Sequence, residues 1–288
     1  MMATKSLRDI FAEIPELSAL PFEAWRISPL AGLTNRSVRV SAGRLDYVLR
    51  LPGEVAGQYL SRVAELNNAR LAAESKLSPP LLFADARRGI VLMSYLAGSR
   101  HLTPDDLKDT QVVSDVANLL SRLHGSGLQF QGTMAAFPII DRYMQIGSDD
   151  RLRRLRRAAI PLQTALGTDQ MAMVPSHIDP NPANVLRDAD GRLVLIDWEF
   201  SAMCEPIWDL AAVAIEGQLD PATEDLLLLT YEAKAGKIPR QRFQMLKLAL
   251  HLVAATWAKA ELVAGADRPE IAALLEDRCA ALEAVFAG

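Results

Sequence analysis

The sequence has few cysteines and no large excess of charge of either sign. Only Cys204 and Cys279 occur among 288 residues, too few for the disulfide framework of a secreted domain. The two thiols fit a reducing compartment, and we expect a cytoplasmic protein. The formal net charge is -4. The chain therefore lacks the basic balance that binding to nucleic acid requires, and we expect no nucleic acid partner.

Long uninterrupted apolar runs are also absent. Residues 1–20 mix charged side chains among apolar ones, so they predict no signal peptide. The most apolar late stretch, residues 246–266, includes two lysines, a histidine and a glutamate, which is too polar for a helix that crosses a bilayer. We expect no membrane insertion, and this stretch predicts a buried helix of a large core.

The first third of the chain has the pattern of a small antiparallel sheet. Residues 37–51 alternate as a hairpin of two strands, and residues 81–85 and 90–96 predict two further strands. Between these pairs, residues 59–75 carry apolar side chains at helical spacing without an internal glycine or proline. The sequence therefore predicts an N-terminal lobe, residues 1–97, of antiparallel strands and one helix.

After Gly98 the pattern becomes helical. A capping signal at residues 103–106 predicts one helix that runs to His124. A short hairpin over residues 185–196 interrupts the helical pattern. The sequence thus predicts an α+β fold with a second, mainly helical lobe over residues 98–288. Its later helices are predicted at residues 206–217, 221–235, 240–264 and 269–287.

One short segment has the pattern of a phosphoryl-transfer site. His177–Asn184 has the form H-x-D-x-x-x-x-N, and thirteen residues later a predicted strand leads into Asp197. In this pattern Asp179 is placed to orient a hydroxyl group and take its proton. Asn184 and Asp197 supply the hard oxygen ligands that Mg²⁺ prefers, and His177 braces the loop. A chance match in an ordinary loop is the alternative, but the strand, turn and strand between Asn184 and Asp197 favour the kinase pattern.

This segment, with Ile196–Glu199 and Glu205–Ala211, resembles the choline/ethanolamine kinase and aminoglycoside phosphotransferase superfamily. Ala31–Arg36, Tyr47–Gly53 and the helix after them resemble the choline kinase-like branch more closely than the antibiotic-resistance branch. The resemblance implies a protein-kinase-like bilobal fold that binds ATP and Mg²⁺ between a small sheet lobe and a larger helical lobe.

The resemblance also implies where the nucleotide binds. Gly32, Thr34 and Asn35 would form the turn over the phosphates through backbone N–H groups and the two polar side chains, although a full G-x-G-x-x-G is absent. Ser94 to Leu96 would form the hinge that hydrogen-bonds adenine through its backbone. An ordinary buried strand is the alternative for this last segment.

Arg50 occupies the strand position where protein kinases have the lysine that binds the α- and β-phosphates. By the resemblance, Glu65 on the following helix is its ion-pair partner. Arginine keeps the charge but favours bidentate contacts. The alternative for Arg50 is a surface cation on a strand. Asp209 would cap and brace the catalytic loop rather than take part in the chemistry.

Part of an acceptor site is visible by the same resemblance. Glu216 matches an acidic position near choline, and Trp257 matches one tryptophan of the aromatic cage that binds a quaternary ammonium group. Ala254 stands where the partner tryptophan is expected. The alternatives are that Trp257 is a core residue and that Glu216 ends its helix. The arginines of residues 151–157 predict a solvated helix face, with a surface for an anionic acceptor as the alternative.

The sequence therefore predicts an ATP-dependent small-molecule kinase that phosphorylates an alcohol hydroxyl, best choline or a related amino alcohol. Thiamine and aminoglycosides are alternative acceptors, because the fold does not decide between them. A nucleotide-binding pseudoenzyme with a regulatory role is a further alternative. A protein kinase is disfavoured because the chain lacks the full glycine-rich loop and an A-P-E segment.

Overall fold

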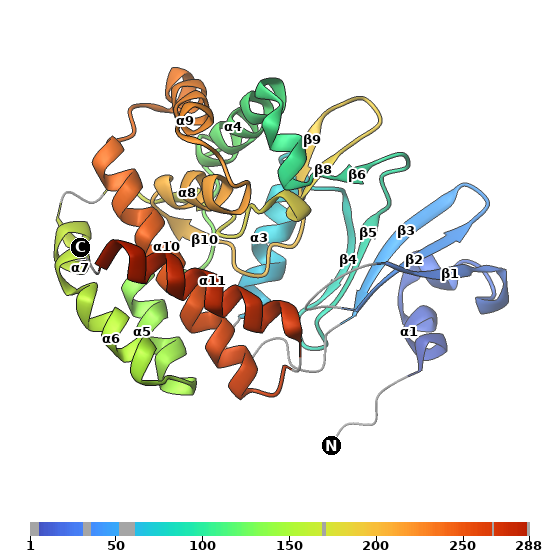
Figure 1. Cartoon of the computed structure of the whole chain (residues 1–288). Coiled ribbons are helices and arrows are strands. Elements are labelled where there is room, and N and C mark those ends of the chain that lie inside the picture. Colours follow the sequence, from blue (N-terminus) through green and yellow to red (C-terminus); the bar gives the residue numbers. More distant parts are fainter. Residues whose placement is uncertain (1–5, 31–35, 52–60, 169–170, 267, 287–288) are drawn as a thin grey trace.

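The computed structural model describes residues 6–30, 36–51, 61–168, 171–266 and 268–286, and these form two lobes of unequal size (Figure 1). The smaller lobe contains a five-stranded antiparallel sheet with the strand order β1-β2-β3-β5-β4. The four strands predicted from the sequence, β2 to β5, are confirmed. The strands are β1 (Arg26–Leu30), β2 (Arg36–Ala42), β3 (Leu45–Leu51), β4 (Leu81–Asp85) and β5 (Ile90–Ser94).

Strand β1 is the one strand of this sheet that the sequence pattern does not predict. It contains Pro29, which lies opposite Val38 of β2. Proline has no N–H to donate, so it argues against a strand in the middle of a sheet. Strand β1 pairs only with β2 at the edge of the sheet, where the missing donor is tolerated.

The smaller lobe has more helix than the single one predicted. Helices α1 (Leu7–Glu13) and α2 (Pro15–Ser18) and the 3-10 turn η1 (Phe22–Ala24) precede the sheet. A capping box at Ser6 starts α1, which is a signal that the sequence contains. The helices bury Phe11 and their other apolar side chains against one side of the sheet, in a separate small core.

The predicted helix between the strand pairs is α3 (Arg62–Glu74), and it joins the lobes (Figure 1). Its buried Ala69 and Ala72 belong to the core of the larger lobe. The fully buried Asn68 side chain donates a 2.9 Å hydrogen bond to the Ser201 carbonyl of that lobe. The helix that carries Glu65 is therefore fixed to the larger lobe by Asn68, Ala69 and Ala72, which are spaced to share one helix face with Glu65.

The larger lobe is mainly helical, as predicted, and α10 lies at its centre. Helix α10 packs against α5, α8 and α11 and buries apolar side chains from Phe243 to Ala260. The predicted buried helix is thus confirmed, and no helix among the described residues is both long and apolar enough to span a membrane. The helices are α4 (Thr110–His124), α5 (Ala136–Ile146), α6 (Asp150–Ala158), α7 (Ile160–Gly167), α8 (Ile207–Glu216), α9 (Pro221–Ala235), α10 (Arg240–Val263) and α11 (Pro269–Phe286).

The prediction of one helix from residue 103 to His124 is wrong in one respect. The segment consists of a 3-10 turn, η2 (Pro104–Lys108), followed by α4. Asp109 between them has extended backbone angles, and its side chain accepts a hydrogen bond from the Gln111 N–H. A second N-cap therefore interrupts the helix after its first turn.

Short strands frame the segment between residues 174 and 204. The predicted hairpin is confirmed as β8 and β9, with Gly191 at a positive φ of 81° in its turn. Strand β6 extends this hairpin, and β7 pairs with β10 in a separate antiparallel ladder; these three strands are not predicted from the sequence. The strands are β6 (Arg100–His101), β7 (Val174–Ser176), β8 (Val185–Arg187), β9 (Leu193–Leu195) and β10 (Ala202–Cys204).

Candidate active site

The loop that follows β7 is held by a buried carboxylate. Asp209, in the first turn of α8, accepts hydrogen bonds of 2.8 Å from the backbone N–H of both His177 and Ile178. His124 of α4 lies 3.1 Å from the same carboxylate through Nε2. Ile178 has a φ of 75°, which is unfavourable for a β-branched residue and persists only where the surroundings enforce it. Asp209 therefore braces the loop, as the resemblance implies.

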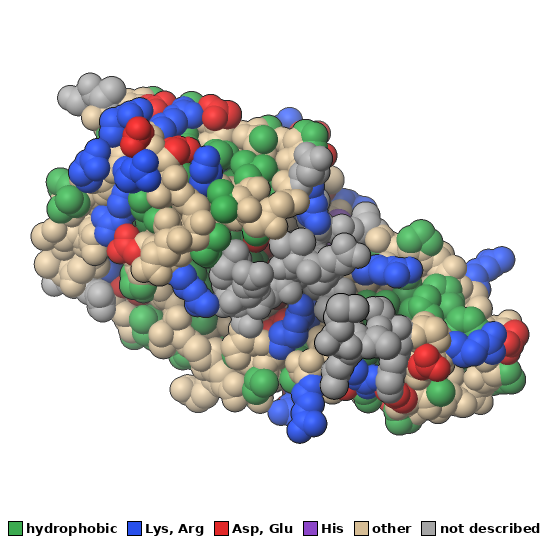
Figure 2. Space-filling view, turned by 90° about the horizontal axis from the view of Figure 1, so that it is seen from below, with side chains coloured by type: hydrophobic (Ala, Val, Ile, Leu, Met, Phe, Trp, Pro, Cys, Tyr) green, Lys and Arg blue, Asp and Glu red, His purple; other side chains and the backbone are tan. Residues whose placement is uncertain are grey.

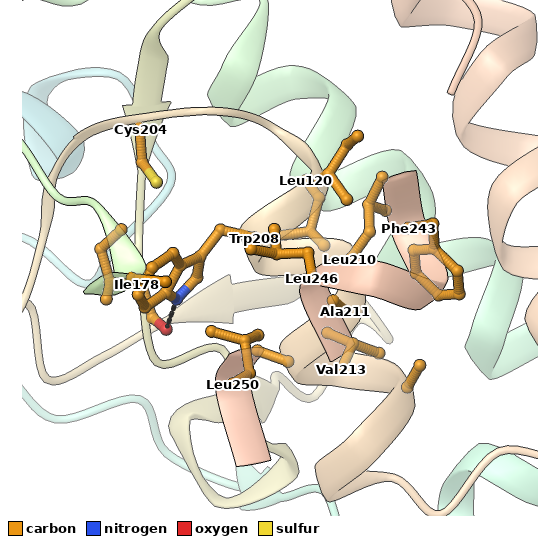
Figure 3. Packing of buried hydrophobic residues seen from close by; sticks show 14 of the residues in the cluster. Leu120, Ile178, Cys204, Trp208, Leu210, Ala211, Val213, Phe243, Leu246 and Leu250 are labelled. Atoms are coloured by element: carbon orange, nitrogen blue, oxygen red, sulfur yellow. Dashed lines mark hydrogen bonds between the residues drawn. The ribbon is translucent and has the colours of Figure 1, made fainter. Parts of the chain in front are cut away.

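The core below the loop supplies a further contact. Figure 3 shows Trp208 of α8 beside Ile178, with the hydrogen bond from the indole Nε1 to the Ile178 carbonyl drawn as a dashed line. This bond is 2.8 Å long. In the same view, Leu246 and Leu250 of α10 belong to this cluster of apolar side chains. The backbone around Ile178 is thus fixed by α8 on both its N–H and its carbonyl side.

The His177 side chain connects the loop to the segment before Asp197. Its Nε2 lies 2.9 Å from the Ile196 carbonyl, and because a carbonyl only accepts, Nε2 carries the proton. Burial lowers the pKa of His177, so the ring is neutral near pH 7. It also meets the Trp198 ring edge-on. His177 is a structural brace, as predicted.

Asp179 is the carboxylate at the centre of the site. Asn181 Nδ2 donates to its Oδ1 at 2.9 Å, and Asn184 Nδ2 donates to its Oδ2 at 3.0 Å. Burial raises the pKa of Asp179 to about 8, the Asn181 hydrogen bond opposes this, and the negative charges of Asp197, Glu216 and Glu199 raise it further. A carboxylate with a pKa near the working pH is suited to accept a proton from a hydroxyl group.

Arg50 joins the two lobes at the site. Its guanidinium forms an ion pair with Glu65 of α3 and donates a 2.8 Å hydrogen bond from Nη1 to Oδ1 of Asp197. Arg50 is 8% exposed, so it is not a surface cation. The predicted pairing with Glu65 is present. The additional contact with Asp197 places the strand cation of the smaller lobe directly beside a predicted metal ligand.

The site has the oxygen donors for a magnesium ion that also binds phosphates. Asn184 Nδ2 donates to both the backbone and the side-chain oxygens of Asp179, which leaves Asn184 Oδ1 available to bind a metal. Arg50 contacts only Oδ1 of Asp197, so Oδ2 would be available as a second ligand. The described residues contain no cluster of three or more His, Cys, Asp or Glu side chains that could hold a metal. Two protein oxygens suit Mg²⁺, which takes its other ligands from water and substrate phosphates.

In the predicted hinge, Ser94 to Leu96, two backbone N–H groups already donate hydrogen bonds to other backbone carbonyls of the smaller lobe. The Ser94 N–H donates to the Pro80 carbonyl at 2.9 Å, and the Tyr95 N–H donates to the Asp46 carbonyl. Pro80 has no N–H and cannot return a bond to the Ser94 carbonyl. The Ser94 carbonyl and the Leu96 N–H are therefore the backbone groups of this segment that suit an adenine edge. The predicted phosphate turn, Gly32 to Asn35, lies outside the described residues.

Glu216 is the last residue of α8, and its negative charge contributes to the raised pKa of Asp179. Arg278 of α11 donates a 2.6 Å hydrogen bond from Nη2 to Oε1 of Glu216. Trp257 of α10 is partly exposed, so it is not enclosed in the core. Sequence reasoning missed Arg278; an arginine within the apolar pattern of residues 271–282 is the signal that could have indicated it.

Several arginines of helix α6 form ion pairs with neighbouring acidic residues. Arg151 pairs with Glu276 and Glu283, and Arg156 pairs with Asp141. Figure 2 shows basic side chains gathered with acidic ones among them on the part of the larger lobe away from the sheet. These contacts favour the solvated helix face over a surface for an anionic acceptor.

Comparisons with known proteins identify the family of the chain. A profile described as the phosphotransferase enzyme family matches residues 26–251. The chain belongs to this family. The resemblance stated from the sequence motifs is thereby confirmed. The matched residues include most of the N-terminal lobe as well as the segment from His177 to Asp197.

The chain is also similar to a named relative and to proteins of known structure. Protein LicA from Haemophilus influenzae is 30% identical over 226 residues, which are 76% of this chain but just under two thirds, 66%, of that protein. A choline/ethanolamine kinase family protein from Mesorhizobium loti is 27% identical, with a TM-score of 0.82 over 98% of this chain and 94% of the other. The choline kinase LicA from Streptococcus pneumoniae is 23% identical, with a TM-score of 0.85 over 97% and 98%. The predicted kinase-like bilobal fold is confirmed.

Proposed function

We propose that this protein is an ATP-dependent kinase that phosphorylates the hydroxyl group of choline or a related amino alcohol. One observation carries the proposal: Arg50 pairs with Glu65 and with Asp197 at the same time. This joins the sheet, α3 and the segment after the catalytic loop into one unit. In kinases such a unit positions the phosphates of the nucleotide against the transferring residues.

ATP is the proposed phosphoryl donor. Its adenine would contact the Ser94 carbonyl and the Leu96 N–H, and its phosphates would lie near Arg50. Gly32, Thr34 and Asn35 remain predicted phosphate contacts. Mg²⁺ held by Asn184 and Asp197 would neutralise charge on the phosphates.

In the proposed transfer, Asp179 orients the hydroxyl group of the acceptor. The acceptor oxygen forms a bond to the γ-phosphorus while the bond from this phosphorus to the β,γ-bridging oxygen breaks, and the electron pair leaves with ADP. The hydroxyl proton passes to the Asp179 carboxylate, whose raised pKa makes it an adequate acceptor for that proton. Asp209 and His177 hold the loop in place and take no part in proton transfer.

The proposed acceptor carries a positive charge next to the hydroxyl group. Glu216 supplies a carboxylate near Asp179, and the partly exposed Trp257 supplies an aromatic face. Aromatic faces and carboxylates together recognise ammonium groups that have few or no hydrogen-bond donors. The similarity to a choline/ethanolamine kinase family protein over nearly the whole chain supports the same class of acceptor.

We also propose that the protein works in the cytoplasm, with ATP and the alcohol as its partners. Cys204 and Cys279 are both free and buried. Reduced, unpaired thiols fit a reducing compartment.

ADP formation with magnesium tests the proposal across a panel of acceptors: choline, ethanolamine, thiamine, an aminoglycoside and a simple sugar. We expect turnover with choline or ethanolamine and none when magnesium is chelated. Turnover only with thiamine or the aminoglycoside would replace the proposed acceptor class. ATP binding without turnover on any of the five would favour a pseudoenzyme.

A further inference from the structure

Arg278 and Glu216 form a contact between two helices that lie far apart in the sequence. The Arg278 side chain is 11% exposed, whereas the Glu216 side chain is 37% exposed. The arginine thus reaches the carboxylate from the protein interior, and the carboxylate lies nearer to solvent. The bond joins Nη2 to Oε1 only, so Oε2 of Glu216 is left for another partner.

The groups around Arg278 favour its contact with Glu216. Its Nη1 lies 3.5 Å from Nδ1 of His251 on α10 and 3.6 Å from Asp277. Burial and then the Arg278 charge lower the pKa of His251 to about 4, so the histidine stays neutral and does not compete for Glu216. The buried Nε of Arg278 has no hydrogen-bond partner among the described residues. A buried guanidinium with an unpaired N–H is unfavourable, and its principal charged partner is Glu216.

We propose that Arg278 is a specificity-determining positioning residue, which holds the Glu216 carboxylate ionised and oriented so that Oε2 binds the cationic group of the acceptor. This inference rests on the proposed function, since it concerns the charge of the acceptor. Burial raises the pKa of Glu216 and the Arg278 charge opposes that rise, so the arginine favours the anionic form that an ammonium group requires.

Two other roles for Arg278 make different predictions. As a competing cation it would weaken the binding of a cationic acceptor, and its removal would improve that binding. As a purely structural tie between α8 and α11 it would affect every acceptor alike. A pair of acceptors with the same shape and different charge separates these roles. Choline and its neutral isostere 3,3-dimethyl-1-butanol are such a pair.

The experiment compares wild type with Arg278→Gln. For each alcohol we would measure kcat and KM, or the inhibition constant against choline if the neutral isostere is not phosphorylated. We expect the KM of choline to rise about tenfold in the variant. The constants for the neutral isostere and for ATP should change by less than about twofold, because neither depends on the Glu216 charge.

Four further variants make the result specific. Arg278→Lys keeps the charge and should restore part of the choline affinity. Glu216→Gln should reproduce the loss, and the double variant should lose little more than either single one, since both act through one contact. Arg151→Gln breaks the ion pairs between α6 and α11 without touching Glu216 and should leave the choline KM unchanged. If Arg278→Gln does not fold, Arg278→Lys and Glu216→Gln carry the comparison.

The outcomes separate this inference from the function on which it rests. A choline KM that is unchanged or lower in Arg278→Gln overturns the inference, and so does an equal rise for both alcohols. In each of these cases the wild-type protein still phosphorylates choline. If the wild type phosphorylates no amino alcohol, the proposed function fails and the inference fails with it.

Discussion

The proposed catalytic loop and the proposed acceptor side of the site are built in opposite ways. The loop is fixed through its backbone: Asp209 holds two N–H groups and Trp208 holds a carbonyl, and both side chains are buried. The acceptor side consists of partly exposed side chains, Glu216 and Trp257, on separate helices. Substitutions on the acceptor side can therefore change specificity while the transferring loop keeps its shape.

The largest effect is expected at the centre of the loop. Asp179→Ala removes the proposed acceptor of the hydroxyl proton, so kcat should fall about 1000-fold. ATP binding, measured by calorimetry, should remain near the wild-type value. Asp190→Ala in the exposed turn of the β8–β9 hairpin is the matched control and should retain full activity. A kcat within tenfold of wild type in Asp179→Ala would remove this residue from the chemistry.

A smaller loss is expected when the brace of the loop is altered. In Asp209→Asn one of the two backbone N–H groups faces an amide NH₂ and loses its acceptor. We expect unfolding in urea to show a loss of about 3 kcal/mol, and kcat to fall roughly 10- to 100-fold through misplacement of Asp179. The exposed N-cap variant Asp220→Asn should change neither. Wild-type kcat in Asp209→Asn would show that the loop does not need this anchor.

On the acceptor side the expected effect is on binding. Trp257→Ala should raise the KM of choline about tenfold, since it removes an aromatic face, with kcat and the KM of ATP nearly unchanged. Trp257→Phe should retain most of the affinity. If kcat falls in Trp257→Ala as much as the KM of choline rises, the two sides of the site are not independent.

The smallest expected effect is a dependence of stability on pH. The pKa of Asp179 is raised to about 8 in the folded protein, above its value in the unfolded chain. The folded state thus favours the protonated form of Asp179. The stability that this preference contributes is fully present below about pH 4, and it is lost as pH rises through about 8. Asp179→Asn should therefore raise Tm by at least about 2 °C at pH 8.5, and have little effect at pH 4. Equal Tm values at pH 8.5 would contradict the raised pKa.

The difference between the two sides also explains what the sequence could predict. Asp179, Asn184 and Asp197 fall within one short stretch whose spacing has a chemical meaning, and the structure brings them together as expected. Arg50 and Glu65 were identified through the family resemblance, because kinases carry an ion pair at fixed positions on a strand and the following helix. A short sequence motif and this resemblance were sufficient for these residues.

The remainder depends on contacts between distant segments. Arg278 reaches Glu216 across 62 residues, and His124 reaches Asp209 across 85; neither pairing has a local signal. Strands β7 and β10 have three residues each, too few for an alternating pattern to be recognised. The helix boundary at Asp109 was not predicted, because both the preceding and the following residues are helical in pattern.

Transfer of phosphate from ATP to choline is the most direct test of the whole account, and ³¹P NMR of the reaction mixture measures it. The account predicts ADP and phosphocholine in equal amounts with the wild-type protein and neither with Asp179→Ala. ADP with free inorganic phosphate and no phosphorylated alcohol, or the same phosphocholine signal from both proteins, would contradict it.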